Sequence, residues 1–545
     1  MSRRFLYFPL AFLLTALGQS SFAQQSCEKL KDLQLPKVEI TSATLVQSGS
    51  FAISAPTIAG RATVKLGAHC EVKAVARPTS DSEIGIEIWL PAQNWNGKYE
   101  QIGNGGWAGA IHEPPLAGAV RRGFVAAATD DGHKGGMTDD GRKDGTLAEF
   151  AIGHPEKLID YGYRALGATR ATALAAIKAF YGHDAVRSYF VGCSDGGREA
   201  LMVAQRFPED FDGILAGDPG NNWSHWGAGL VWNEQAQLAD SPGAIPITKR
   251  ALIQNAVIAA CDTIDGVKDG LISDPRFCHF DPSVLTCKGT DAPDCLTAPQ
   301  VTALKKIYDG PKNPRTGEQI YPGYPPGIEN APGSIIRPSP QGTLSFGDTY
   351  FGQALFEQKN WDFRTLDFDK DIAFSDRKGS PVVDSINPDL RSFRDHGGKL
   401  IQYHGWSDTL IPPGGSVVYY ENVEAFLSKY PDPRGGSSNP VDNFYRLFMI
   451  PGMGHCNGGA GPTSIAPTDS VDATDPKHDL MLSLEQWVEK GIAPEMVIGS
   501  GKAPKDPTKT MSRPICPYPQ VTRYKGTGDT NDAASFECTA PPVHQ

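Results

Sequence analysis

One short stretch, Gly192-Cys-Ser-Asp-Gly196, constrains this chain more than any other part of it. Residues 188–191 before it favour a β-strand, and residues 197–207 after it have helical spacing. A serine in the pattern G-x-S-x-G between a strand and a helix fits the sharp turn that presents a nucleophile above a sheet. Such a turn strains the serine backbone, so small residues must surround it. We therefore expect Ser194 to be a catalytic serine rather than part of an ordinary glycine-rich turn.

Strands and helices alternate along much of the chain. Short β segments are predicted within 37–76, and further strands at 87–91, 123–128, 188–191, 211–216, 399–403 and 444–450. Helices are predicted at 161–181, 197–207 and 476–490. This alternation is typical of a mostly parallel sheet with helices on both faces. The predicted class is therefore α/β, and specifically an α/β-hydrolase fold.

The stretch 219–395 interrupts this alternation. It is rich in Pro, Gly, Asp and aromatic residues and contains few clean strand patterns. The chain of 545 residues is long for one compact domain, which favours a domain with a large insertion. We therefore predict a catalytic domain made of 24–218 and 396–545, with 219–395 inserted as a lid over the active site.

The first residues resemble an export signal. Arg3 and Arg4 precede an apolar run over 5–17, and Ser21-Phe-Ala23 offers small residues for cleavage. The run is shorter than the roughly 20 residues that a membrane span needs, which argues against an anchor. We predict a signal peptide at 1–23 and a secreted or periplasmic product. The net charge of −11 argues against nucleic acid as a partner, and the oligomeric state stays open.

A catalytic serine needs a base, and the base needs a carboxylate to orient it. In this fold the chain order is serine, acid, histidine. Asp408 follows the strand at 399–403, and His455 follows the strand at 444–450. We expect these two residues to be the acid and the base.

The competing residues are less well placed. His478 falls inside the helix predicted at 476–490, and His544 stands in the C-terminal tail. A solvent-exposed loop carboxylate is the alternative interpretation of Asp408. Asp130 and Asp218 also end strands, but we place both outside the order of the triad.

Two backbone N–H groups should bind the oxyanion. One is expected from Asp195, directly after the nucleophile. The other is expected from the glycine-rich loop Gly103-Asn-Gly-Gly106, where we favour Gly106 and leave its neighbours, or a plain turn, as alternatives. His404, four residues before the acid, is predicted to line the substrate pocket.

The ten cysteines indicate disulfide bonds, because an even number in an exported protein is typical of oxidised pairs. Spacing alone does not fix the pairing, although near neighbours could form local links. Cys193 directly precedes the candidate serine and Cys456 directly follows the candidate histidine, so an assembled triad would bring the two thiols close together. No CxxC pair is present, which argues against zinc. The cysteines are Cys27, Cys70, Cys193, Cys261, Cys278, Cys287, Cys295, Cys456, Cys516 and Cys538.

A second candidate site lies in the segment 261–271. Asp262, Asp265 and Asp269 crowd one loop that also contains glycines. Such crowding is costly without a cation, and hard oxygen ligands favour calcium. The spacing differs from that of an EF-hand, so Asp-Gly turns without a metal are the alternative.

These motifs together resemble the tannase and feruloyl esterase family. Cys193-Ser194, Asp408 and His455-Cys456 match the family's arrangement of a cysteine beside the nucleophile and another beside the base. The resemblance extends over nearly all of the chain after the signal segment. It includes Gly103-Asn-Gly-Gly-Trp107 and Thr129-Asp-Asp-Gly-His133.

The resemblance implies a Cys193–Cys456 disulfide beside the triad, the local pairs 261/278, 287/295 and 516/538, and hence the pair 27/70. It also implies a calcium ion bound in the lid. The implied ligands are the carboxylates of Asp262, Asp265 and Asp269 and the carbonyl groups of Val267 and Leu271.

The resemblance implies hydrolysis of small aromatic esters through an acyl-enzyme, with hydroxycinnamate esters as the first expectation. Gallate esters and terephthalate monoesters are the alternatives within the family. The acid at Asp195 resembles the terephthalate enzymes, but only Arg315, Arg337 and Arg364 are candidates for binding a second carboxylate. A lipase or peptidase of the same fold is a further alternative. A non-catalytic, calcium-dependent phenolic-binding protein is the alternative of another class.

Overall fold

The alternating segments build one mixed sheet in which the three candidate catalytic loops leave at the same edge. The structure, a computed structural model, describes residues 26–53, 62–135, 145–238, 240–337, 345–432, 435, 439–465 and 475–542. The predicted signal peptide at 1–23 and His544 lie outside the described residues. In order across the sheet, the strands are β1 (Val38–Val46), β4 (His69–Ala76), β5 (Ile84–Pro91), β7 (Val125–Thr129), β6 (Lys98–Ile102), β8 (Arg187–Cys193), β9 (Gly213–Gly217), β10 (Lys399–Gly405) and β11 (Tyr445–Ile450).

The strand directions explain the position of the site. From β7 to β11 every neighbouring pair is parallel, whereas β1, β4 and β5 pair antiparallel with their neighbours. Carboxyl ends of parallel strands meet at one edge of a sheet, where α/β proteins bind their ligands. Ser194, Asp408 and His455 follow β8, β10 and β11, so the topology gathers all three at that edge.

Helices cover both faces of the sheet. On one face, α1 (Glu113–Arg121) and α13 (Leu480–Lys490) contribute to a single apolar core. On the other, α3 (Ala165–Tyr181), α4 (Asp195–Arg206) and α12 (Gly414–Leu427) contribute to a second core. α2 (Pro155–Ile159) and a π-helical turn (Asp160–Arg164) precede α3.

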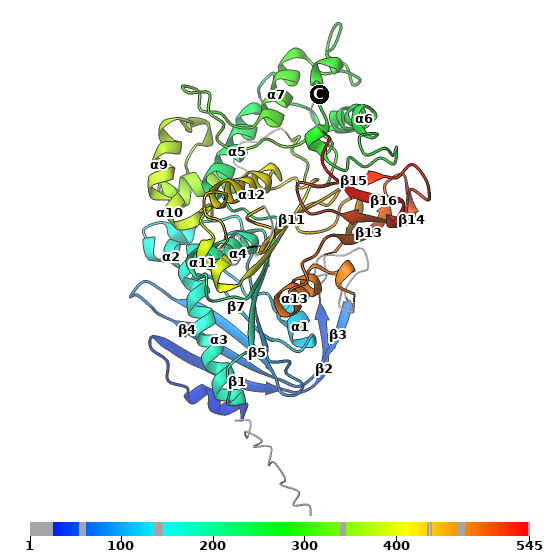
Figure 1. The fold of residues 1–545 in the computed structure, drawn as a ribbon. Helices are drawn as coiled ribbons and strands as arrows, with labels where there is room; N and C mark the ends of the chain where they lie inside the picture. Colours follow the sequence, from blue (N-terminus) through cyan, green and yellow to red (C-terminus); the bar gives the residue numbers. More distant parts are fainter. Residues whose placement is uncertain are drawn as a thin grey trace, which may run out of the picture.

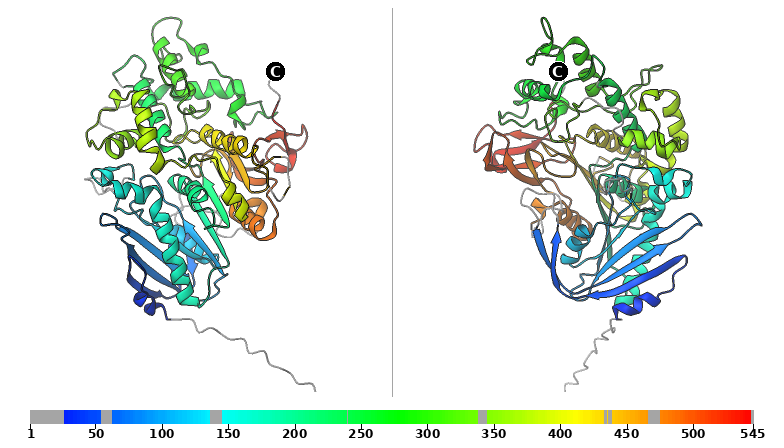
Figure 2. Two further views of the ribbon diagram at one scale, coloured as in Figure 1. Left: turned by 60° about the vertical axis from the view of Figure 1, so that its left-hand side comes forward. Right: turned by 180° about the vertical axis from the view of Figure 1, so that it is seen from behind.

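Between β9 and β10 the described chain forms helices and loops, with no named strand. Figures 1 and 2 show this green to yellow-green segment capping the molecule at the end opposite the blue N-terminal strands. Its helices are α5 (Trp223–Ala236), α6 (Arg250–Cys261), α7 (Ala298–Asp309), α8 (Phe346–Asp348), α9 (Lys370–Lys378), α10 (Ser380–Val383) and α11 (Arg391–His396). We call 219–395 the lid.

The lid shares an aromatic core with the catalytic domain. Trp107 and Tyr161 of the catalytic domain pack in one cluster with Trp223 and Trp226 of α5. The ring centroids of Trp107 and Trp223 lie 4.8 Å apart, and those of Trp223 and Trp226 lie 5.0 Å apart. Burial of such large rings makes this cluster a major stabilising contact between the two parts of the chain.

Two parts of the fold differ from the sequence prediction. The helix predicted at 476–490 divides into a 3-10 turn (Pro476–His478) and α13, because Asp479 takes an extended conformation and caps Leu482 with its side chain. The C-terminal part also adds strands that the pattern did not indicate, shown in orange and red in Figure 1. The added strands are β12 (Gly461–Ser464), β13 (Val497–Ala503), β14 (Asp506–Ile515), β15 (Val521–Tyr524) and β16 (Phe536–Thr539). The hairpin of β2 (Gly49–Ile53) and β3 (Ala62–Leu66) instead lies within 37–76, where short β segments were predicted.

Within the described residues, no helix has both the length and the apolar character required to cross a membrane.

The shared core predicts that truncating Trp223 destabilises the whole protein. Trp223 is 1% exposed, and its replacement by alanine leaves a cavity between the lid and the catalytic domain. We expect Trp223→Ala to lower the free energy of unfolding by about 3–5 kcal/mol in urea titrations. Val284→Ala, at a lid position that is 72% exposed, is the control and should have little effect. Equal effects of the two substitutions would contradict the shared core.

Candidate active site

Ser194 occupies a strained turn between β8 and α4. Its backbone has φ of 93° and ψ of −107°, a conformation that residues other than glycine rarely adopt. The Ser194 N–H donates to the carbonyl oxygen of Gly217 on the neighbouring strand, at 2.9 Å. A Cβ atom added at Gly192 would lie 2.4 Å from the carbonyl oxygen of Gly196. Small residues therefore permit the turn, as the sequence pattern predicts.

The structure brings Ser194, His455 and Asp408 into one chain of hydrogen bonds. Nε2 of His455 lies 2.7 Å from Oγ of Ser194, and Nδ1 of His455 lies 2.7 Å from Oδ2 of Asp408. The other carboxylate oxygen of Asp408 accepts from the N–H groups of Leu410 and Ile411. Both oxygens of the buried acid are therefore fixed in place.

Charges within this chain favour an imidazole that can hold a proton. Burial opposes the charged form of His455, but the adjacent Asp408 outweighs burial and raises the pKa of the imidazole above its usual value. Burial alone would raise the pKa of Asp408, and His455 and His404 reverse this and hold it below the usual range. This is the electrostatic arrangement that a histidine base and its orienting acid require.

His404 does not line a pocket, contrary to our prediction. Its ring is fully buried. Nδ1 lies 2.7 Å from Oγ of Ser416, and Nε2 lies 3.2 Å from Oδ2 of Asp408 and 3.1 Å from the carbonyl oxygen of Ile411. Since both ring nitrogens have partners inside the protein, His404 supports Asp408 from behind.

Asp218 lies beside the triad but is not its acid, because Asp408 is the carboxylate that bonds His455. The chain-order reason given for excluding Asp218 was nevertheless mistaken. Asp218 follows Ser194 in the chain, directly after β9. An oxygen of Asp218, an oxygen of Asp408 and a ring nitrogen of His455 all lie within 4.8 Å of one another. Burial raises the pKa of Asp218 to about 6, although the charge of His404 opposes this shift. Because Asp218 directly follows a strand, the sequence already indicated that it would lie at the same edge of the sheet as the triad.

Disulfide bonds join the cysteines in the five pairs that the resemblance implies. Cys193 and Cys456 form one of them, and they link the residue before the nucleophile to the residue after the base. Cys456 has a positive φ of 63°, so the loop after β11 turns sharply at this link. The remaining pairs are Cys27–Cys70, Cys261–Cys278, Cys287–Cys295 and Cys516–Cys538.

The glycine-rich loop after β6 packs directly against the nucleophile turn. The carbonyl oxygen of Asn104 accepts from the N–H of Gly196 at 2.8 Å. Gly106 has φ of 60°, and a Cβ atom there would lie 2.6 Å from the carbonyl oxygen of Gly145. The hydroxyl of Tyr161 donates to the carbonyl of Gly106 at 3.2 Å. Gly106 is thus held beside the turn that carries Asp195.

The acidic loop of the lid offers the oxygen donors that suit calcium. In the structure, Asp262 lies 3.0 Å from Nζ of Lys505, and Asp269 lies 2.5 Å from Nη2 of Arg513. Asp265 accepts from Oγ of Ser273 at 2.5 Å. Among the described residues, Asp262, Asp265 and Asp269 are not one of the sets with three ligand atoms within 4.8 Å of one another. The oxygen atoms of these carboxylates are suitable ligands for calcium, but in this structure they contact Lys505, Arg513 and Ser273.

Comparison with known proteins agrees with this geometry. The chain is 39% identical to an uncharacterized esterase of Xanthomonas campestris pv. campestris, over 97% of this chain and 93% of the relative. It is 33% identical to the mono(2-hydroxyethyl) terephthalate hydrolase of Piscinibacter sakaiensis, over 95% and 92%. The crystal structure of feruloyl esterase B from Aspergillus oryzae superposes with a TM-score of 0.82 at 30% identity, over 94% of this chain and 99% of that one.

Family membership follows from the match along the chain. Residues 70–539 match the family model described as tannase and feruloyl esterase, and this span contains the candidate triad and the lid. The resemblance inferred from the sequence motifs is therefore confirmed, as is the predicted α/β-hydrolase fold. The chain belongs to the tannase and feruloyl esterase family of carboxylic ester hydrolases.

Proposed function

We propose that this protein is a secreted serine hydrolase that cleaves esters of aromatic carboxylic acids through an acyl-enzyme on Ser194. The observation that carries the proposal is the hydrogen-bonded chain from Ser194 through His455 to the buried Asp408. A non-catalytic binding protein has no need of a strained serine in contact with an oriented imidazole.

The reaction follows from the positions of these groups. His455 Nε2 takes the proton of the Ser194 hydroxyl while Oγ attacks the ester carbonyl carbon. The tetrahedral intermediate collapses, its alcohol leaves with the proton from His455, and the acyl group stays on Ser194. Water then attacks the acyl carbonyl as His455 accepts its proton. The second tetrahedral intermediate breaks its bond to Oγ of Ser194, which takes the proton back from His455, and the carboxylic acid leaves. Asp408 stabilises the imidazolium in both steps.

The oxyanion of each intermediate needs donors that are already in place. We assign this role to the backbone N–H groups of Asp195 and Gly106. The first begins α4, so the helix N-terminus adds a favourable partial positive charge. The second belongs to the loop that Asn104 holds against the same turn.

Aromatic side chains of the lid support an aromatic acyl group. A Cβ atom on Gly106 would lie 3.4 Å from the ring of Phe346, so this lid residue reaches the assigned oxyanion loop. The rings of Phe346 and Trp226 lie 5.3 Å apart, and Nε1 of Trp226 donates to the carbonyl of Leu410, close to the acid. Flat rings beside the assigned oxyanion loop and the loop of the acid favour planar acyl groups over the long chains that a lipase takes.

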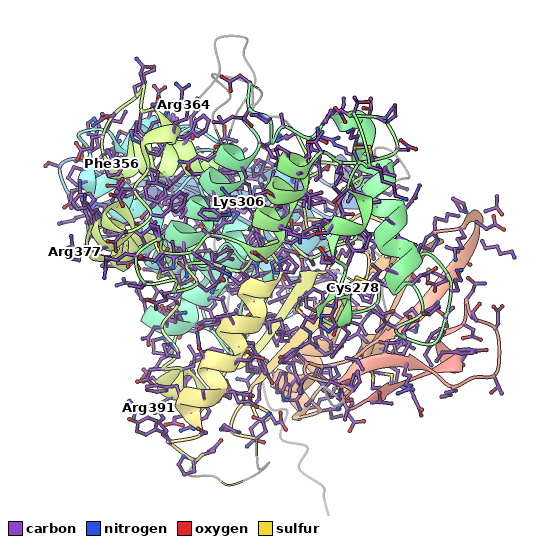
Figure 3. The ribbon with its side chains drawn as sticks, turned by 90° about the horizontal axis from the view of Figure 1, so that it is seen from above. Cys278, Lys306, Phe356, Arg364, Arg377 and Arg391 are labelled. Atoms are coloured by element: carbon purple, nitrogen blue, oxygen red, sulfur yellow. A yellow bond between two sulfur atoms is a disulfide. The ribbon has the colours of Figure 1, made fainter. Side chains whose placement is uncertain are left out.

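Within this class we favour hydroxycinnamate esters over gallate esters and terephthalate monoesters. A terephthalate monoester carries a second carboxylate that needs a cation. Arg315 and Arg364 pair instead with Asp369 and Asp362 at the surface, and Figure 3, viewed from above, places Arg364 at the edge of the lid. The third candidate, Arg337, is exposed. The acid at Asp195 is buried against Arg198, so it does not distinguish one substrate from another.

Export and calcium binding complete the proposal. Five disulfides support an oxidising destination, because such bonds persist in secreted and periplasmic proteins. We assign the calcium ion to the carboxylates of Asp262, Asp265 and Asp269, with the carbonyls of Val267 and Leu271. Bound there, it would neutralise the acidic loop and stabilise the fold of the lid.

Replacing the nucleophile tests the function. We expect Ser194→Ala to lower kcat on methyl ferulate by about 10⁶-fold, because the acyl-enzyme cannot form. A fluorophosphonate probe should label the native protein and fail to label the variant. Ser428→Ala, at an exposed helix end, is the control and should keep full activity. Full activity of Ser194→Ala on ferulate, gallate and terephthalate esters, or no labelling of the native protein, would refute the proposal.

The two acids near His455 should affect the pH profile differently. Either Asp408→Asn or Asp218→Asn removes a negative charge, so the pKa of His455 falls and the acid limb of kcat/KM moves to lower pH. Asp408→Asn also loses the bond that orients the imidazole and should reduce kcat by about 10⁴-fold. Asp218→Asn keeps that bond and should keep most of kcat. Unshifted acid limbs in both variants would contradict this electrostatic account.

Calcium should stabilise the protein independently of its activity. After dialysis against EDTA, we expect added CaCl₂ at 100 times its Kd to raise the free energy of unfolding by about 2.7 kcal/mol, visible as a higher Tm. Asp265→Asn should abolish that rise, whereas Asp281→Asn, elsewhere in the lid, should preserve it. Elemental analysis should find one calcium per chain. A native protein with no bound calcium and no shift in Tm would refute the assignment.

A further inference from the structure

Three carboxylates converge beneath the nucleophile turn. Asp131, Asp195 and Glu199 are each 0% exposed, and one oxygen from each lies within 4.8 Å of the others. Nε of Arg198 lies 2.5 Å from Asp195, and the hydroxyl of Tyr161 donates to the same oxygen at 2.8 Å. One guanidinium balances one carboxylate, so the ionised cluster would keep two uncompensated negative charges in the protein interior, at a large cost.

The hydrogen-bond pattern indicates which carboxyl groups in this cluster carry a proton. Oε2 of Glu199 accepts from the N–H of Asn104 at 2.8 Å, and Oδ2 of Asp131 accepts from the side-chain amide of Asn104 at 3.2 Å. The second oxygens, Oδ1 of Asp131 and Oε1 of Glu199, accept from none of the described N–H or O–H donors. One oxygen of each carboxyl group lies within 4.8 Å of the other, so a proton on either group would supply the donor that the other lacks.

We propose that Asp131 and Glu199 share one proton and act as a positioning pair that holds the loop 103–107 against the nucleophile turn. This inference rests on the proposed function, since it gives the pair a role in placing the oxyanion donors.

Asn104 transmits the effect of the positioning pair. Its backbone N–H binds Glu199, its side-chain amide binds Asp131 and the carbonyl of Thr129, and its carbonyl accepts from Gly196. One residue thus connects both acids to the N-terminus of α4. Gly106 follows two residues later in the same loop, so a displacement of Asn104 moves the assigned oxyanion donor away from Ser194.

The raised pKa values of the two acids make the stability that the pair contributes depend on pH. Burial raises the pKa of Glu199 to about 7, with the charge of Asp195 adding to the shift, and burial also raises the pKa of Asp131 well above the usual value. Arg198 opposes both shifts, and the buried Tyr161 is a further ionisable group beside the cluster in the part of the chain that the structure describes. Because these folded-state pKa values exceed the unfolded ones, the stabilisation is complete below the usual carboxyl pKa. It is lost as pH rises through about 7.

Two substitutions at Asp131 distinguish the effect of its hydrogen bonds to Asn104 and Glu199 from the effect of filling the buried space. Asn keeps an oxygen for the amide of Asn104 and offers an N–H to Glu199 that does not titrate. Leu fills similar space, makes neither bond and is also strained at the φ of 58° that Asp131 adopts. We expect Asp131→Asn to keep kcat near the native value and to retain it at alkaline pH. Asp131→Leu should lower kcat by roughly a hundredfold with KM little changed, as for the loss of an oxyanion donor.

Thermal unfolding from pH 5 to 9 provides a readout that needs no substrate. The Tm of the native protein should fall with rising pH more steeply than that of Asp131→Asn, because only the native pair loses its proton. Asp184→Asn, an exposed acid paired with Lys178, is the control and should follow the native slope. If Asp131→Leu does not fold, Glu199→Leu, which removes the acceptor for Asn104 at a helical position of α4, replaces it in the activity comparison. Glu199→Gln keeps that acceptor and should also flatten the slope.

Two results would overturn the proposal. One is equal pH dependence of Tm in the native protein and in Asp131→Asn and Glu199→Gln. The other is equal activity of Asp131→Asn and Asp131→Leu. Failure of the proposed function would be recognised separately, as an inactive native protein that no fluorophosphonate labels, and the Tm comparison would stand regardless.

Discussion

The strained backbone at Ser194 is the constraint on which the rest of the structure depends. A residue with φ of 93° holds that conformation only when its surroundings impose it. Here the carbonyl of Gly217 accepts a hydrogen bond from the N–H of Ser194. Gly192 and Gly196 have no side chains, which permits the tight turn, and α4 begins immediately afterwards. The parallel order of β8, β9, β10 and β11 then places the acid and the base at the same edge.

The elements that carry chemistry were largely predictable from the sequence, because they depend on local pattern and chain order. A strand, the motif around Ser194 and a helix follow one another within one short segment, and the acid and base each follow a strand. The disulfide pairs required the resemblance to a family, since spacing alone left them open. The C-terminal strands β12–β16 were missed because their segments carry no clear alternation of polar and apolar residues.

Roles that depend on distant partners could not be predicted. His404 precedes the acid in the sequence, and we therefore predicted that it lines the pocket. Its ring is buried instead, and its two nitrogens contact Ser416, Asp408 and a backbone carbonyl. The cluster of Asp131, Asp195 and Glu199 joins the loop after β7 to the first turns of α4, which are separated along the chain. The sequence contains the three acids, but only the fold shows that their side chains converge and are fully buried.

The aromatic core between the lid and the catalytic domain has a consequence for how such enzymes diversify. Trp107 and Tyr161 pack on Trp223 and Trp226, so swinging the lid away as a hinged flap would expose several large rings to water at a high cost. We therefore expect the lid to stay packed on the catalytic domain when a small ligand binds. New preferences would arise by exchanging side chains along a fixed frame, and an exchange at Trp226, which belongs both to the shared core and to the rings proposed to favour an aromatic acyl group, would change folding stability and substrate choice together.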